Sequence, residues 1–207
     1  IRIIDYIGTF AFAISGLRMA AIKHFDWFGA YVVGLVTAVG GGTMRDLFLG
    51  QTPFWMTDGS YLVCTGIAFL FAVLFRKWLF DFNNTFFLFD TIGLGLFVVV
   101  GFEKTMDAGY SQWLAIVMGT ITGAAGGVLR DVLLAQEPLI FRKEIYAMAC
   151  VIGGVVYWLC NMLEVGALAS PILSALSVMA TRIVAMKYNI GLPLLTKYED
   201  GEKKAKG

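Results

Sequence analysis

The chain has 207 residues, of which 58% are hydrophobic, and its mean hydropathy is +0.76. A chain this apolar has too little polar surface to cover a soluble domain, so the composition indicates an integral membrane protein. The formal net charge of +1 gives no indication of nucleic-acid binding.

Seven hydrophobic stretches follow one another along the chain and are joined by short loops. They run over 3–22, 27–49, 59–75, 86–102, 112–134, 145–163 and 168–186. A transmembrane helix needs about 20 mostly apolar residues, and continuous apolar runs disfavour membrane-spanning strands, which alternate. We therefore predict an all-α integral membrane protein with seven transmembrane helices.

A polar motif in the second stretch is repeated in the fifth, 85 residues later. The shared pattern is Gly-Gly-x-x-Arg-Asp-x-x-Leu-x-Gln-x-Pro, and it begins at Gly41 and again at Gly126. At the same offset the chain also repeats Asp5/Asp90, Phe12/Phe97, Gly16/Gly101, Thr37/Thr122 and Tyr61/Tyr146. The chain is thus a duplicated three-helix unit, over 3–75 and 86–163, followed by a seventh transmembrane helix at 168–187 and a tail at 188–207.

The duplication and the basic residues predict how the helices are oriented. Because three helices form one unit, the second unit enters the membrane from the opposite face, and the segment 76–85 is too short and polar to be an extra linker helix. When each lysine or arginine is assigned to its nearest loop or helix end, 13 of the 16 fall on one side of the membrane. The positive-inside rule therefore predicts an inverted repeat with the amino terminus outside and the carboxyl-terminal tail in the cytoplasm.

Glycine clusters lie about halfway along the second and fifth stretches. They are Gly40, Gly41 and Gly42 in the second and Gly126 and Gly127 in the fifth. Each glycine weakens a helix by about 1 kcal/mol relative to alanine, which predicts a kink or break. Carbonyls freed there, beside the hydroxyls of Thr37 and Thr122, would suit a partly dehydrated monovalent cation. The alternative is that the glycines only let helices pack closely.

An Arg-Asp pair follows each glycine cluster, as Arg45-Asp46 and Arg130-Asp131. An ionisable residue at membrane depth is costly unless it faces water or a partner. At a rise of 1.5 Å per residue the pairs lie roughly 10 Å from the midplane, on opposite sides. Our hypothesis is that the aspartates attract cations at two mouths while the arginines hold the helix or gate the mouth. The alternative is a salt bridge at a helix end.

Three further polar residues lie at the ends of predicted helices. Asp5 and Asp90 start the first and fourth helices, where a carboxylate suits the helix dipole. Lys104 ends the fourth helix on the outer side and breaks the repeat, so it either snorkels or gates the pore. The chain shows no catalytic constellation or metal-ligand cluster, so we expect no enzyme, no resident metal and no cofactor.

The paired motifs, the three-plus-three-plus-one helix plan and the acidic helix starts resemble the prokaryotic branch of the trimeric intracellular cation (TRIC) channels, over about residues 3–190. The resemblance implies a homotrimer, in contact with lipid in the plasma (inner) membrane of a prokaryote, with an hourglass pore for potassium and sodium inside each subunit. Carried over by position, the residues lining or shaping that pore would be Gly40, Gly41, Gly42, Arg45, Asp46, Gly126, Gly127, Arg130 and Asp131.

Two departures from the family pattern carry consequences. Ala125 stands where the family often has a third glycine, which implies a milder kink in the fifth helix. Only Lys104 matches the lysine-rich, lipid-binding segment of the animal members, so lipid in the pore stays open. A secondary transporter of a small solute such as glycine is the alternative function, because such carriers also build their sites from inverted repeats with broken helices.

Overall fold

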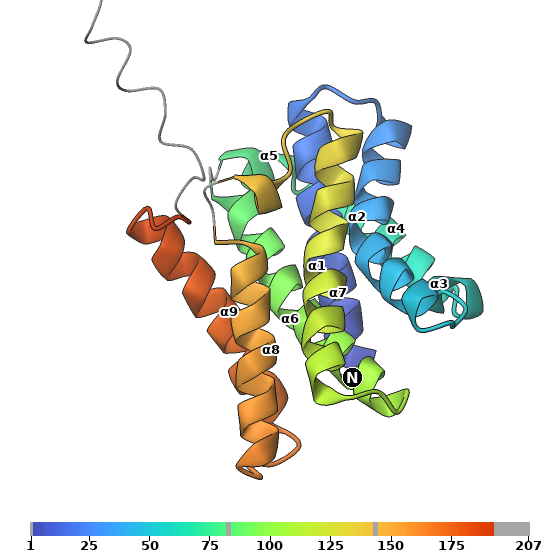
Figure 1. The fold of residues 1–207 in the computed structure, drawn as a ribbon. Helices are drawn as coiled ribbons and strands as arrows, with labels where there is room; N and C mark the ends of the chain where they lie inside the picture. The colour runs from blue at the N-terminus through green and yellow to red at the C-terminus, as the bar shows by residue number, and fades with distance from the viewer. Residues whose placement is uncertain (1, 82–83, 143–144, 193–207) are drawn as a thin grey trace, which may run out of the picture.

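The computed structural model describes residues 2–81, 84–142 and 145–192, and these residues form helices with no β-strand among them (Figure 1). The helices in chain order are α1 (Arg2–Ile22), α2 (Trp27–Phe48), α3 (Phe54–Thr57), α4 (Ser60–Leu74), α5 (Arg76–Asp81), α6 (Thr85–Asp107), α7 (Gln112–Leu133), the 3-10 helix η1 (Leu139–Phe141), α8 (Ala147–Met162) and α9 (Ala169–Lys187). The predicted all-helical class is confirmed.

The long helices match the hydrophobic stretches of the sequence. Within the described residues α1, α2, α6, α7 and α9 are long and apolar enough to cross a membrane. The helices α4 and α8 are apolar but shorter, with 15 and 16 residues. Length and composition therefore identify five candidate spans and two shorter apolar helices at the seven predicted positions.

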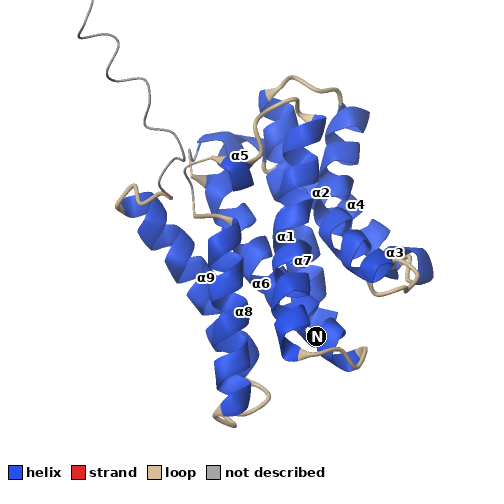
Figure 2. Cartoon of the chain, in the orientation of Figure 1, coloured by secondary structure: helices blue, strands red, loops and turns tan. Residues whose placement is uncertain are grey.

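Four helices form the centre of the molecule, and the others pack around it. The pairs α1/α2 and α6/α7 pack together, and they meet across the centre through α1 against α6 and α2 against α7. Figure 2 shows α4 on one side of this group, and α8 and α9 on the other. The duplicated halves thus face each other through their first two helices.

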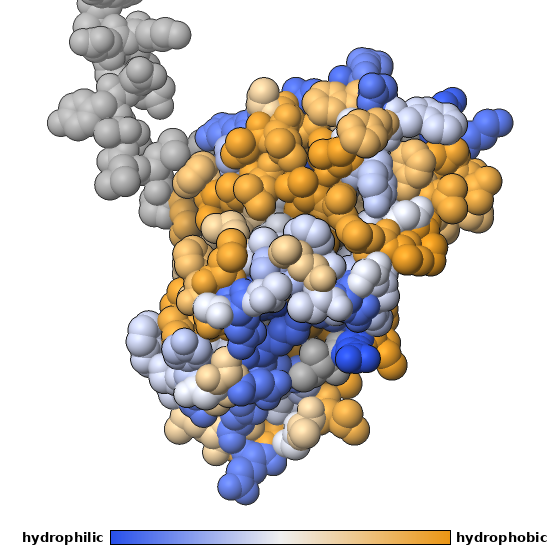
Figure 3. Space-filling view, turned by 90° about the vertical axis from the view of Figure 1, so that its right-hand side faces the viewer, coloured by the Kyte–Doolittle hydropathy of each residue, from blue (hydrophilic) through white to orange (hydrophobic). Residues whose placement is uncertain are grey.

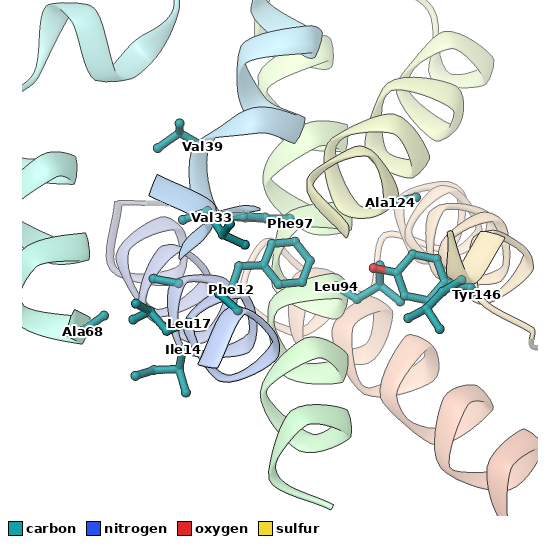
Figure 4. Close-up of a cluster of buried hydrophobic side chains, with 14 of the residues drawn as sticks. Phe12, Ile14, Leu17, Val33, Val39, Ala68, Leu94, Phe97, Ala124 and Tyr146 are labelled. Carbon is teal, nitrogen blue, oxygen red and sulfur yellow. The ribbon is translucent and has the colours of Figure 1, made fainter. Parts of the chain in front are cut away.

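The centre between the halves is filled by two phenylalanines related by the 85-residue offset. Phe12 of α1 and Phe97 of α6 are buried, and their rings meet edge to face with centroids 5.1 Å apart (Figure 4). Each ring packs on a glycine of the other helix, Phe97 on Gly8 and Phe12 on Gly93. The middle of the molecule is therefore apolar and tightly packed.

The outer surface is strongly apolar, as a membrane-embedded protein requires. Large side chains such as Leu70, Leu74 and Leu168 are exposed on the subunit, at 60%, 79% and 84%. Figure 3 shows apolar side chains over a wide band of one face and polar side chains gathered below it. The tail beyond residue 192, and Lys143 among the basic residues used to predict orientation, lie outside the described residues.

Candidate functional site

The helices α2 and α7 cross at the glycine clusters, and both are α-helical without interruption through them. The predicted break is therefore wrong, while a kink at the glycines stays a prediction. A Cβ atom added at Gly41 would overlap the carbonyl oxygen of Thr122, and one at Gly126 would overlap that of Thr37. The glycines bring the two backbones into contact, which is the close-packing alternative.

The two threonines beside the crossing are turned away from it. Thr37 Oγ1 donates to Val33 O at 2.6 Å, and Thr122 Oγ1 donates to Met118 O at 2.6 Å. The hydroxyls pack against glycines of the neighbouring helices, Gly16 for Thr37 and Gly101 for Thr122. Each hydroxyl therefore satisfies the helix that carries it, a common arrangement for threonine in membrane helices.

The remaining predicted glycines each face a side chain. Gly40 packs on Leu129, Gly42 on the ring of Phe54, and Gly127 on the hydroxyl of Tyr146. These contacts extend the close packing along both helices on either side of the crossing.

A group of polar and aromatic residues lies at one end of the molecule; we call it the first polar cluster. It consists of Asp5, Arg45, Asp46, Phe54, Tyr61 and Lys104. Asp5 Oδ2 accepts from Tyr61 Oη at 2.8 Å and pairs with Lys104 Nζ at 3.3 Å. The Lys104 ammonium lies 4.9 Å from the centre of the Phe54 ring, a cation–π distance. Its side chain is 26% exposed.

Asp46 explains the spacing of the repeated motif. Arg45 Nη2 and Nε bind Asp46 Oδ1 at 2.6 and 2.8 Å, so the expected pairing of the two neighbours is present. Asp46 Oδ2 accepts from the backbone N–H of Phe54 at 2.8 Å, at the start of α3. In the second half Asp131 Oδ2 accepts from Leu139 N at 3.0 Å, at the start of η1. The motif therefore ends one helix and caps the next.

The turn between these helices also repeats. Gly50 and Ala135 occupy the same place in the two halves, with φ of +69° and +50°. Glycine reaches this left-handed region without strain, whereas alanine does so at a cost. The backbone carbonyls of Asp46 and Asp131 each accept from the glutamine five residues later, Gln51 N at 2.8 Å and Gln136 N at 3.0 Å. The leucine and glutamine positions of the motif thus belong to one helix-ending turn.

Asp58 ties α1 to the start of α4 beside the first polar cluster. The Ser60 hydroxyl and backbone N–H donate to Asp58 Oδ1, at 2.5 and 3.0 Å, and hold the pKa of Asp58 below its usual value. Tyr6 Oη donates to Asp58 Oδ2 at 3.3 Å. This carboxylate therefore stays ionised at neutral pH and fixes the turn.

The corresponding group in the second half, the second polar cluster, is fully enclosed. It consists of Ser15, Asp90, Arg130, Asp131, Tyr146 and Arg182. Arg130 Nη1 binds Asp90 Oδ1 at 2.5 Å and Ser15 Oγ at 2.9 Å, while its Nε binds Asp131 Oδ1 at 2.8 Å. Arg182 of α9 pairs with Asp90 Oδ2 at 3.8 Å and lies over the Tyr146 ring.

Asp5 lies in the first turn of α1, at the helix start as predicted, whereas the prediction for Asp90 is wrong. Asp90 lies beyond the first turn of α6, which begins at Thr85, and both carboxylates bind cationic side chains of other helices. The missed partners are Tyr61, Tyr146 and Arg182. Only the repeat of Asp5, Asp90 and the two tyrosines at the 85-residue offset could have pointed to them.

The two clusters differ in how well their polar atoms are satisfied. Among the described residues, Asp90 Oδ2, Arg130 Nη2 and Tyr146 Oη are buried and have no hydrogen-bond partner. Tyr61, the counterpart of Tyr146, does bind its aspartate. Buried polar atoms without hydrogen-bond partners are costly, so these three atoms can still gain from a further polar partner.

The residues described show no group of three or more histidine, cysteine or acidic side chains arranged to hold a metal ion. Formally each cluster holds two acidic and two basic side chains, so each is neutral overall. The chemistry available is thus electrostatic and hydrogen-bonding, at two places on either side of the apolar centre.

A family model described as "Glycine transporter" matches residues 2–77 and again 87–162, the same offset of 85. The chain is 38% identical over 211 residues to the UPF0126 inner membrane protein YadS of Escherichia coli K12, covering 96% of this chain and 97% of that protein. It is 36% identical to a UPF0126 membrane protein of Vibrio cholerae, covering 92% and 81%.

Solved structures of TRIC channels are also similar to this chain along most of its length. A structure reported for conductance through TRIC cation channels superposes with a TM-score of 0.84 at 35% identity, covering 95% of this chain and 97% of that one. The TRIC orthologue from Rhodobacter sphaeroides gives 0.85 at 30% identity, covering 91% and 97%. With its duplicated motif, its helical fold and these matches, the chain belongs to the membrane-protein family that includes the UPF0126 proteins and the TRIC cation channels.

Proposed function

We propose that the chain is a channel for the monovalent cations potassium and sodium in the inner membrane of a prokaryote. The observation that carries this proposal is the match, along nearly the whole chain, to structures of TRIC cation channels. Intramembrane ion pairs such as Arg45-Asp46 and Arg130-Asp131 support it, because such pairs typically mark ion pathways.

In this proposal seven helices span the membrane, with α4 and α8 completing the count, as two inverted three-helix repeats plus α9. The paired contacts of Gly41 with Thr122 and of Gly126 with Thr37 support a pseudo-two-fold relation between the halves. The amino terminus lies outside and the tail in the cytoplasm. Three such subunits form a homotrimer surrounded by lipid.

The proposed pore runs between the two polar clusters, through each subunit, with an hourglass shape. In this proposal the residues that line or shape the pore are Thr37, Gly40, Gly41, Gly42, Arg45, Asp46, Thr122, Gly126, Gly127, Arg130 and Asp131. The narrow point is the crossing of α2 and α7 beside Phe12 and Phe97. An apolar constriction excludes hydrated ions, so conduction requires that the two helices separate there.

Lys104 is proposed to gate the first mouth. Its ammonium pairs with Asp5 and lies over Phe54, so a cation leaving or entering meets a fixed positive charge. Lys104→Gln removes that charge and leaves the first cluster with one net negative charge. We expect potassium flux from loaded liposomes to rise several-fold, with Lys187→Gln, an exposed lysine at the end of α9, as the control. Equal flux in wild type and Lys104→Gln contradicts gating by Lys104.

Transport of a small amino acid is the second candidate, and the three atoms of the second cluster that lack a hydrogen-bond partner favour it. Arg130 Nη2 and Tyr146 Oη are donors for a carboxylate, and Asp90 Oδ2 is an acceptor for an ammonium group. A zwitterion such as glycine offers both groups, and the matching family model carries the description of a glycine transporter.

Labelled glycine uptake, measured on the liposomes used for potassium flux, separates the two candidates. The channel proposal predicts potassium flux without saturable glycine uptake. The carrier predicts saturable uptake that falls in Tyr146→Phe, which removes only the hydroxyl, and not in the exposed control Tyr110→Phe. Uptake of that kind without potassium flux contradicts the channel.

A further inference from the structure

A cavity of about 450 Å³ lies where α1 ends and α2 begins. The end of α4 and the short helix α5 complete its walls, with Ala72, Val73, Arg76 and Leu79 among the lining residues. None of the residues assigned to the pore lines this cavity. It is therefore a separate feature that the channel proposal does not use.

One part of the cavity is basic. Arg18 and Arg76 both line it, and Arg18 Nε donates to the carbonyl of Leu79 at 3.0 Å, which fixes the guanidinium against α5. The acidic lining residue, Asp26, accepts from Gly29 N at 2.7 Å as the cap of α2. Among the described residues that line the cavity, two arginines therefore face one carboxylate. Guanidinium groups suit phosphate oxygens, which they bind through two parallel hydrogen bonds.

The rest of the cavity is apolar and aromatic. Phe69, Ala72 and Val73 of α4 form one wall, and Trp27 lies at the opening, 72% exposed. The Trp27 and Phe69 rings meet edge to face with centroids 6.2 Å apart. An exposed tryptophan at a helix end is typical of the membrane interface, where the ring sits at headgroup level. A hydrocarbon chain fits along this wall.

The place of the cavity along the helices also suits a ligand with a charged headgroup and an apolar chain. The cavity lies at the ends of the spans formed by α1 and α2, which is where lipid headgroups meet the protein. Lys23 and Lys77 are exposed beside it and add positive charge. Basic groups at this depth attract the anionic lipids of the cytoplasmic leaflet.

We propose that this cavity binds an anionic phospholipid, with its phosphate on Arg18 and Arg76 and one acyl chain along Phe69 and Val73. Assignment to the cytoplasmic leaflet rests on the orientation given above. Binding itself requires neither that orientation nor channel activity. The lipid would hold α4 and α5 against α1 and α2.

Native mass spectrometry of the purified protein, titrated with dioleoyl phosphatidylglycerol or dioleoyl phosphatidylcholine, tests the proposal. We expect phosphatidylglycerol to bind more tightly, and Arg76→Gln to weaken it about tenfold, the effect of losing one hydrogen bond to a charged group. Lys187→Gln is the matched control, because Lys187 is an exposed lysine at the end of α9 and does not line the cavity. Ala72→Phe fills the apolar part and should weaken both lipids while leaving the charges unchanged.

Two results overturn the proposal. In the first, the two lipids bind equally and Arg76→Gln behaves like Lys187→Gln. In the second, glycerol 3-phosphate, which has no acyl chain, binds as tightly as phosphatidylglycerol, which makes the cavity a site for free phosphate esters. Thermal unfolding in detergent checks that each variant is folded; Arg76 is exposed, so its substitution leaves the core intact.

Discussion

Asp90 is the carboxylate that pairs with two buried arginines in the described part of the chain. Its two oxygens face Arg130 at 2.5 Å and Arg182 at 3.8 Å, and all three side chains are almost completely buried. Separating charges from water is costly, so a buried pair is tolerated only while both partners remain. The second polar cluster therefore depends on this one carboxylate to join α6, α7 and α9.

We predict that Asp90→Asn destabilises the fold by about 3–5 kcal/mol, the usual effect of leaving a buried charge without its partner. The free energy of unfolding in detergent micelles measures it. Asp107→Asn, at the exposed end of the same helix, is the control and should change stability little. Equal losses in the two variants would show that the buried pairs are not what holds the cluster.

For single residues, the sequence predicts the pairing of side chains only where the two residues are adjacent in the chain. The pairing of Arg45 with Asp46 is predicted because adjacent residues of opposite charge have few other partners at membrane depth. The partners Asp5 and Lys104 are 99 positions apart in the chain. Their meeting depends on how α1 and α6 rotate against each other, which no local pattern encodes.

At the scale of helices, the crossing of α2 and α7 organises the molecule. The two helices touch through Gly41 and Gly126, each facing a carbonyl oxygen of the other helix. The helices remain intact there because packing against a neighbour, with every backbone bond satisfied, is favourable inside a membrane. The propensity of glycine to break a helix is thus overcome by tertiary contact, which is why the predicted break is wrong.

We predict that Gly41→Ala and Gly126→Ala each destabilise the fold by about 1–3 kcal/mol, because the added methyl group forces the two backbones apart. Gly66→Ala in α4 is the matched control, since its Cβ would meet no described atom within 4 Å. Alanine favours helix more than glycine does, so the control should be neutral or stabilising. Unfolding in detergent measures all three, and a similar sign for crossing and control variants would contradict the packing account.

The apolar pattern predicts the long helices to within a few residues, with one clear exception. The fourth stretch is predicted to end at 102, whereas α6 continues to Asp107. Glu103 accepts from Tyr157 at 2.7 Å, and Lys104 pairs with Asp5. These polar partners on other helices stabilise α6 beyond the end of its apolar stretch. The short helices α3, α5 and η1 are too brief for periodicity to reveal.

At the scale of the whole molecule, the two halves are related in sequence and contact but differ in accessibility. The first polar cluster reaches the surface through Lys104, while the second is sealed by Arg182 of α9, a helix outside the repeat. Duplication alone would make both ends alike. The helix α9 therefore makes the two ends of the molecule different.

We predict that the loop after α1 faces the cytoplasm and the end of α6 faces outward. Lys23→Cys should be protected from a membrane-impermeant maleimide in intact cells, and Asp107→Cys should react. Permeabilised cells provide the control, in which both variants react. The opposite pattern in intact cells would reverse the orientation, and equal labelling of both residues would contradict their placement on opposite faces.

If ions cross each subunit between the two polar clusters, single-channel recording detects the current that they carry. Purified protein in planar bilayers under a potassium chloride gradient is compared with protein-free bilayers. The account predicts discrete current steps that reverse near the potassium equilibrium potential. Bilayers that stay silent, while the same protein takes up glycine saturably into liposomes, would contradict the channel and favour the carrier.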